Sequence, residues 1–327
     1  MQGSKPYPAQ EDERARPAVG EEEEGGRSSA AQKITLFRHQ EEPFTELMTT
    51  AAVAFSGRWR DLPVWPRLNQ LVVGPSGSGK TALVRKVAQT LHLPFFQAST
   101  ATWILTGTSG RGALQTWPSL LDFLLENQVG MIFIDEIDKV SGPSEWSSYL
   151  RTELYALLDR TVPSDLIRAS NLGLDSGGDR RKAAAEHAIA QIRLRHGMMI
   201  VAAGAFEAYW SRRSSRPIGF ADAAGAATGS DRPALKDFHD LLPVELANRF
   251  RAKVVYLKPR GLSGYLQMLR QTAEQLPGEL VEPFLELGCE TAVAAFEARL
   301  GPRWIEELVT EVLCREVKAK IDRRVSI

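Results

Sequence analysis

A glycine-rich run is the strongest chemical signal in the sequence. It consists of Gly74, Pro75, Ser76, Gly77, Ser78, Gly79, Lys80 and Thr81, after a short apolar run and before a helical pattern. With this spacing the glycines let the backbone wrap around phosphate groups, with its N–H groups pointing inward at the positive end of the following helix. We expect Lys80 to reach the β- and γ-phosphates of a nucleotide and the Thr81 hydroxyl to hold Mg²⁺.

Two acidic residues further along the chain complete this pattern. Asp135 and Glu136 directly follow the apolar run 131–134. A carboxylate that emerges from a buried strand beside a phosphate loop can hold Mg²⁺, directly or through water, and a second one can polarise the attacking water. Taken alone, the pair could simply be the acidic end of a strand. Together with the glycine-rich run it predicts an ATP hydrolase, with ATP and Mg²⁺ as cofactors.

These residues need a scaffold that brings the ends of strands together. Up to residue 257, apolar runs of strand length alternate with helical patterns. We predict strands at 71–73, 94–98, 131–134, 198–203 and 253–257, and helices at 44–55, 80–91, 118–126 and 149–158. Strands that are apolar throughout are typical of a parallel sheet that is covered on both faces. The predicted fold is therefore α/β, a P-loop NTPase sheet sandwiched by helices.

The composition divides the chain into three parts. Residues 1–30 are rich in Pro, Gly, Glu and Arg and contain almost nothing apolar, which predicts a disordered tail. Residues 31–260 form the predicted nucleotide-binding domain. In 261–327 the strand patterns stop, and three or four helices with breaks at Pro277-Gly278 and Gly301-Pro302 predict a C-terminal helical lid subdomain.

Two stretches within the α/β part resist this assignment. Residues 163–197 and 211–234 are long and rich in Gly, Ser, Arg and Asp, so we interpret them as functional or mobile loops.

The overall composition argues against several classes of protein. Lys+Arg and Asp+Glu each total 40, so the formal net charge is zero and gives no general attraction to nucleic acid or membranes. The two cysteines, Cys289 and Cys314, argue against a disulfide framework and are interpreted as buried thiols. No apolar run approaches the ~20 residues that cross a bilayer, and no signal peptide is recognisable. We therefore expect a cytoplasmic protein with no membrane partner.

The motifs together resemble the AAA+ ATPases, and among them the ClpX/HslU branch of protein unfoldases. Besides the two site motifs, the similar segments are Phe37 to Gln40 at the hydrophobic-Gly-Gln motif near adenine, Gly204 to Phe206, Ile218 to Phe220, Leu241 to Phe250, and Glu297 to Glu306 at the sensor-2 helix. The resemblance runs from about Leu36 to Val317. It implies a homo-oligomer, a hexamer-like ring or a helical assembly, that hydrolyses ATP at its subunit interfaces.

The same resemblance assigns two arginines. Arg249 matches the arginine finger, which reaches the ATP of the neighbouring subunit. Arg299 matches sensor 2, which contacts ATP from the helical lid. The alternatives are an ion-paired surface arginine at 249, with Arg251 as the backup finger, and a solvated helix charge at 299.

The sequence also departs from this family. The segment aligned with the aromatic pore loop, 107–110, contains no aromatic residue. Trp103 or Trp117 could substitute after a shift, but each is more simply interpreted as a core residue. The strand that ends at Ala203 lacks the polar sensor-1 residue, and no counterpart of the accessory N-domain is recognisable.

The sequence leaves the biological work of this ATPase open. One hypothesis is a motor that remodels or disassembles a protein complex, with a protein client that the sequence does not identify. The alternative is an ATP-dependent switch that oligomerises on duplex DNA and recruits a partner enzyme, because basic clusters at 181–182, 193–195 and 212–216 lie in the two predicted loops. Such clusters are also typical of solvated faces. A third hypothesis is a regulatory module in which ATP only switches conformation.

Overall fold

We describe the chain from a computed structural model that places residues 36–106, 116–141, 145–164, 177–214 and 232–325. From Ile34 onward the chain forms one compact unit. Among the placed residues, no helix combines the length and the apolar character needed to span a bilayer.

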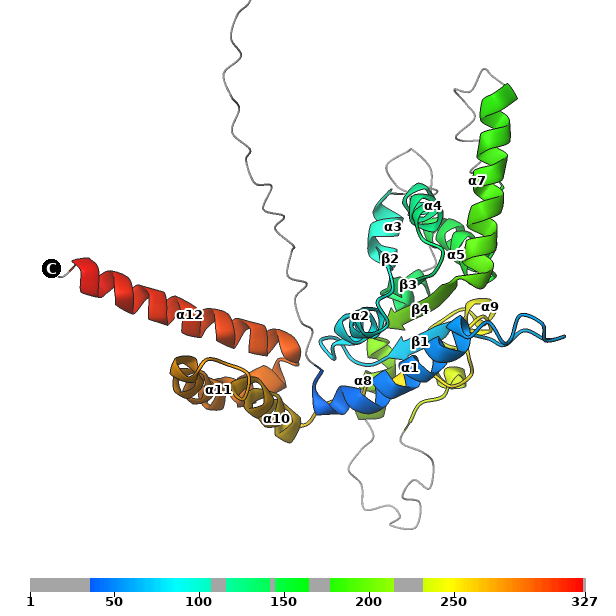
Figure 1. The fold of residues 1–327 in the computed structure, drawn as a ribbon. Helices are drawn as coiled ribbons and strands as arrows, with labels where there is room; N and C mark the ends of the chain where they lie inside the picture. The colour runs from blue at the N-terminus through cyan, green and yellow to red at the C-terminus, as the bar shows by residue number, and fades with distance from the viewer. Residues whose placement is uncertain (1–35, 107–115, 142–144, 165–176, 215–231, 326–327) are drawn as a thin grey trace, which may run out of the picture. The chain divides into compact units, whose positions relative to one another are not determined.

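Five parallel strands form a single sheet in the order β2-β3-β4-β1-β5 (Figure 1). The strands are β1 (Gln70–Val73), β2 (Phe95–Ser99), β3 (Gly130–Asp135), β4 (Met198–Gly204) and β5 (Val255–Tyr256). All five predicted strands are present, although β5 is shorter than predicted. The predicted parallel sheet covered by helices is confirmed.

Side chains of the central strands alternate between two apolar cores, because successive residues of a strand point to opposite faces. One core contains Leu71, Ile132 and Ile200. It includes residues of α4 (Thr116–Glu126), α5 (Glu145–Leu158) and α7 (Gly177–His196). The other contains Val72 and Phe133 and includes residues of α1 (Glu41–Phe55) and α2 (Lys80–Thr90). Both faces of the sheet are therefore buried, as the continuous apolar runs predict.

The four helices predicted in this part of the chain are present, together with further helical elements that the sequence did not predict. They are η1 (Arg38–Gln40), α1 (Glu41–Phe55), α2 (Lys80–Thr90), α3 (Thr100–Thr106), α4 (Thr116–Glu126), η4 (Ile137–Ser141), α5 (Glu145–Leu158), α7 (Gly177–His196), α8 (Glu207–Ser214), η6 (Leu235–Phe238) and α9 (Val244–Ala247). Trp103 and Trp117 are 2% and 0% exposed, which confirms their interpretation as core residues. The predicted pore-loop segment, 107–110, lies outside the described residues.

The interpretation of 163–197 as a loop is wrong for its second half, where the 20-residue helix α7 forms. The helix has no continuous apolar stripe, which is the signal that the prediction used. Ala190 and Leu194 are buried, whereas Ile189 and Ile192 are 42% and 60% exposed. Likewise, the predicted loop 211–234 begins inside α8.

After β5, three helices share a third apolar core: α10 (Leu262–Ala273), α11 (Gly278–Glu297) and α12 (Pro302–Val325). Their boundaries confirm the predicted breaks. Gly288 of α11 permits the close packing of α10, because a Cβ there would lie 2.2 Å from Leu269 Cδ1. The prediction of buried thiols is wrong: Cys289 and Cys314 are free and exposed, because both lie on helix faces that point away from this core.

Candidate functional site

The glycine-rich run joins the end of β1 to the start of α2. Gly77 and Gly79 adopt left-handed backbone angles, with φ of 67° and 84°. Only glycine adopts such angles readily, so these two positions require the residue type that the sequence provides. The run therefore forms a strand–loop–helix phosphate-binding turn, as predicted.

Lys80, the first residue of α2, turns back over this loop. Its Nζ donates to Gly74 O at 2.8 Å and to Pro75 O at 3.0 Å. Burial lowers the pKa of Lys80, and the charges of Asp135 and Asp138 oppose that change. An ammonium group held by two neutral carbonyl groups can exchange these bonds for charged phosphate oxygens.

Thr81 and Asp135 meet even though they are distant in the sequence. The Thr81 hydroxyl donates to Asp135 Oδ2 at 2.8 Å. A hydroxyl and a carboxylate are the hard oxygen ligands that Mg²⁺ prefers, and this ion is usually held by one or two such groups together with nucleotide phosphates. The described residues contain no group of three or more His, Cys, Asp or Glu that could hold a metal without such help. The pair thus fits a nucleotide-bound Mg²⁺.

Glu136 follows Asp135 in an unusual backbone conformation. Its φ is 58°, which is strained for a residue with a side chain and costs roughly 1–3 kcal/mol. Two hydroxyl groups hold it there: Ser99 Oγ donates to Glu136 Oε2 at 3.0 Å, and Thr100 Oγ1 donates to Glu136 O at 2.6 Å. Ser99 and Thr100 were not identified from the sequence. Their position directly after the predicted strand 94–98 is the signal that could have indicated them, because this strand pairs with β3.

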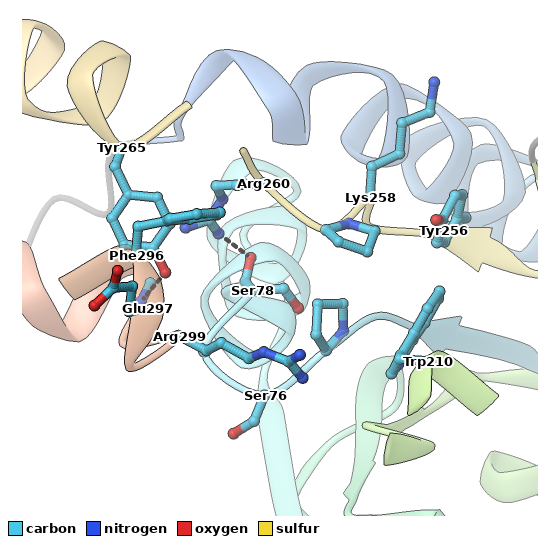
Figure 2. Close-up of a pocket in the computed structure, with 14 residues that line it drawn as sticks. Ser76, Ser78, Trp210, Tyr256, Lys258, Arg260, Tyr265, Phe296, Glu297 and Arg299 are labelled. Atoms are coloured by element: carbon cyan, nitrogen blue, oxygen red, sulfur yellow. Dashed lines mark hydrogen bonds between the residues drawn. The ribbon is translucent and has the colours of Figure 1, made fainter. Parts of the chain in front are cut away.

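A cavity of about 670 Å³ opens beside the phosphate loop (Figure 2). Its walls come from the loop, from the segment after β5 and from the C-terminal helices. Arg299 lines this cavity, and in Figure 2 its guanidinium extends into the cavity next to Ser76. The structure therefore brings Arg299 to the phosphate loop of its own chain.

The turn before α12 lies directly against the phosphate loop. Gly301 has a φ of 61°, and a Cβ at this position would lie only 1.9 Å from Gly77 O. The first turn of α12 also brings Arg303 close enough for its charge to add to the burial that lowers the pKa of Lys80. Sequence reasoning gave Arg303 no separate role, although it lies in the segment that resembles sensor 2.

A second group of contacts supports the loop from outside. Gln40 Nε2 donates to Gly79 O at 3.1 Å. Arg260 Nη2 donates to Ser78 O at 2.9 Å (Figure 2). Arg260 Nε also donates to His39 Nε2 at 3.0 Å. Burial, together with the charge of Arg260, lowers the pKa of His39 to about 4, so the ring is neutral and can accept this bond near pH 7. The sequence did not point to Arg260.

Arg249 lies elsewhere. It lines a different cavity, of about 320 Å³, together with Trp59 and Asp159. Its Nε and Nη2 donate to the two carboxylate oxygens of Asp159 at 2.8 and 2.7 Å, and its guanidinium lies 4.4 Å from the ring centre of Tyr155. These contacts hold Arg249 in its own subunit, whereas the role expected of it requires a neighbouring one.

Comparisons with known proteins agree with this geometry. Residues 70–180 match the family described as "ATPase family associated with various cellular activities (AAA)". The ClpX subunit of the ATP-dependent Clp protease from Treponema denticola is 39% identical over 87 residues, which cover 25% of this chain and 21% of that protein. ClpX from Azotobacter vinelandii is 29% identical over 152 residues, 45% of this chain and 33% of that protein.

A longer match, to ClpX 2 from Wolinella succinogenes, has 23% identity over 261 residues, 75% of this chain and 64% of that protein. The chain thus spans about a fifth to two thirds of the length of these relatives. The phosphate loop, the Asp135–Glu136 pair beside it and these similarities together support a P-loop ATPase that is similar to the AAA+ ATPase ClpX.

Proposed function

We propose that this chain hydrolyses ATP at the subunit interfaces of a homo-oligomer and uses the energy to remodel or disassemble a protein complex. The contact between Thr81 and Asp135, with Glu136 next in the chain, carries the proposal, because it joins a phosphate loop to a carboxylate suited to hydrolysis. The relatives are named as ATP-binding subunits of the Clp protease, which supports a protein client. A cytoplasmic location stays a prediction.

Each residue of the site has a defined task in this proposal. The N–H groups of the phosphate loop and Lys80 bind and orient the phosphates. Thr81 and Asp135 hold Mg²⁺, which supplies charge neutralisation when bound. Glu136 orients the attacking water and accepts its proton, and its strained backbone conformation fixes the direction of the carboxylate.

The arginines of this proposal link nucleotide binding to the assembly of subunits. Arg249 leaves Asp159 and reaches the phosphates bound by a neighbouring subunit, where a guanidinium stabilises charge in the transition state. Arg299 and Arg303 contact the nucleotide of their own subunit. In this scheme residues 31–260 are the nucleotide-binding domain, 261–327 the lid and 1–30 a disordered tail.

The contacts of two of the described basic residues do not favour the DNA-dependent alternative. Arg193 Nη1 donates to Leu124 O at 2.8 Å, and the Arg195 guanidinium lies 4.9 Å from the ring centre of Trp65. Both arginines therefore have partners within the fold. The side chains of the cluster at 212–216 lie outside the described residues.

Electron microscopy of the Glu136→Gln protein tests the proposal. The variant should bind ATP–Mg²⁺ without turning it over, and negatively stained particles are imaged with and without duplex DNA. Closed rings or short helices that form without DNA are the expected result. Assemblies that form only on DNA would replace the motor with the DNA-dependent switch. Single subunits under both conditions would refute hydrolysis at an interface.

A further inference from the structure

Glu207 places a carboxylate on the phosphate loop. It is the first residue of α8, and its Oε1 accepts a hydrogen bond from Ser76 N at 3.0 Å. Backbone N–H groups of such a loop normally donate hydrogen bonds to phosphate oxygens. Because Pro75 has no N–H, Ser76 supplies the first backbone N–H donor after Gly74 in the loop. The Glu207 carboxylate thus occupies a backbone N–H donor that is suited to a phosphate oxygen.

The backbone before Glu207 fixes this position. After β4, Ala205 N and Phe206 N both donate to the Asp138 carboxylate, at 3.3 and 3.2 Å. Phe206 is buried and has a φ of 51°, so the chain turns sharply before α8 begins. Trp210 Nε1 donates back to Ala205 O at 2.6 Å and closes this turn. The braced turn therefore fixes the backbone from which the exposed Glu207 side chain reaches the loop.

The carboxylate lies at the end of the site where the γ-phosphate is expected. β4 is the parallel neighbour of β3, so the residues that follow the two strands meet at the same edge of the sheet. Asp135 and Glu136 follow β3 there. The charge of Glu207 also acts on Lys80, the residue that reaches the β- and γ-phosphates: it raises the pKa of Lys80 and so opposes the effect of burial.

From these contacts we infer that Glu207 is an internal competitor of the γ-phosphate that selects between ATP and ADP. The inference rests on the proposed function, since it requires the loop to bind ATP. In this inference the carboxylate occupies the Ser76 N–H that the γ-phosphate would use, its charge acts on Lys80, and the two groups carry the same sign of charge. Glu207 must withdraw before ATP binds fully, whereas ADP, which lacks the γ-phosphate, leaves it in place. The side chain therefore weakens ATP binding relative to ADP binding.

Calorimetric titrations of the Glu207→Gln and Glu207→Ala proteins test this inference. The ligands are ADP and a non-hydrolysable imido analogue of ATP, both with Mg²⁺. Glutamine keeps the size of the side chain and an acceptor oxygen but removes the charge, and alanine removes both. We expect the dissociation constant of the analogue to fall about tenfold in both variants and that of ADP to change by less than about threefold.

The matched control is Glu279→Gln, which changes a glutamate in the first turn of α11. An acidic residue at a helix start is stabilising in itself, and this control measures that effect away from the loop. An unchanged ratio of the two dissociation constants in both Glu207 variants, with normal circular dichroism, would overturn the inference while leaving the proposed function intact. If neither the wild-type protein nor the variants bind either nucleotide, the proposed function fails, and the inference fails with it.

Discussion

The ion pair between Arg249 and Asp159 allows a catalytic role of Arg249 to be separated from a structural one. If Arg249 only stabilises the fold, Arg249→Ala and Asp159→Asn break the same pair and should have similar consequences. If Arg249 acts on a neighbouring subunit, only its own substitution removes the catalytic group. The two variants therefore form a matched pair.

The stability effect follows from the exposure of the two side chains. They are 26% and 49% exposed, so solvent screens the pair, and such pairs contribute at most about 1 kcal/mol. The contact of Arg249 with the Tyr155 ring adds roughly 0.5–1 kcal/mol. We expect Arg249→Ala to lower the free energy of unfolding by about 1–2 kcal/mol and Asp159→Asn by about 0.5–1 kcal/mol, measured by urea denaturation.

The turnover effect should be much larger and confined to one variant. Removal of an arginine finger reduces hydrolysis by ~10³-fold or more in related phosphoryl-transfer enzymes. We expect such a loss in steady-state ATP hydrolysis by Arg249→Ala, with ATP binding retained. Asp159→Asn should keep turnover within about threefold of wild type, because the finger remains and is released from its partner.

Mixing experiments then identify where Arg249 acts. Lys80→Ala subunits have an intact finger, and Arg249→Ala subunits have an intact phosphate loop. In a random equal mixture about a quarter of the interfaces combine the two intact elements, so hydrolysis should recover to a corresponding fraction of wild type. Equal losses of turnover in Arg249→Ala and Asp159→Asn, or no recovery on mixing, would refute the interfacial role.

Three further predictions test the site and the core. Lys80→Ala should abolish nucleotide binding in calorimetry, and retained micromolar affinity would contradict the role given to Lys80. Gly301→Ala should weaken nucleotide binding at least tenfold with only a small change in melting temperature, because the alanine Cβ would lie 1.9 Å from Gly77 O. Unchanged nucleotide affinity would show that the turn before α12 moves freely. The buried Glu153 accepts a hydrogen bond from Trp103 Nε1 at 2.6 Å. Burial raises the pKa of Glu153 to about 7, although this hydrogen bond acts to lower it. Since the unfolded state then releases the proton at a lower pH than the folded state, stability should be full below about pH 4.5 and fall as the pH rises to about 7, by at most about 1.4 kcal/mol per pH unit. Glu153→Gln should remove that component from urea denaturation curves recorded across this pH range, and an unchanged slope would exclude it.

The sequence alone determined the parts whose signal is local. The phosphate loop was predictable because the spacing of its glycines and the flanking strand and helix are sufficient to form it. The left-handed backbone angles of Gly77 and Gly79 agree with this prediction. The strands were predictable because a sheet buried on both faces requires continuous apolar runs. The breaks around α11 were predictable from Pro and Gly, which interrupt helices wherever they occur.

The tertiary structure decided which distant residues meet. α7 was missed because few of its residues are buried, so burial left no periodic pattern for the sequence to show. Arg260 and Glu207 reach the phosphate loop from segments far along the chain, and no local pattern encodes such contacts. The exposed cysteines were predicted incorrectly for a related reason. A helix fixes the angular spacing of its side chains, but only the packing of its neighbours determines which face is covered.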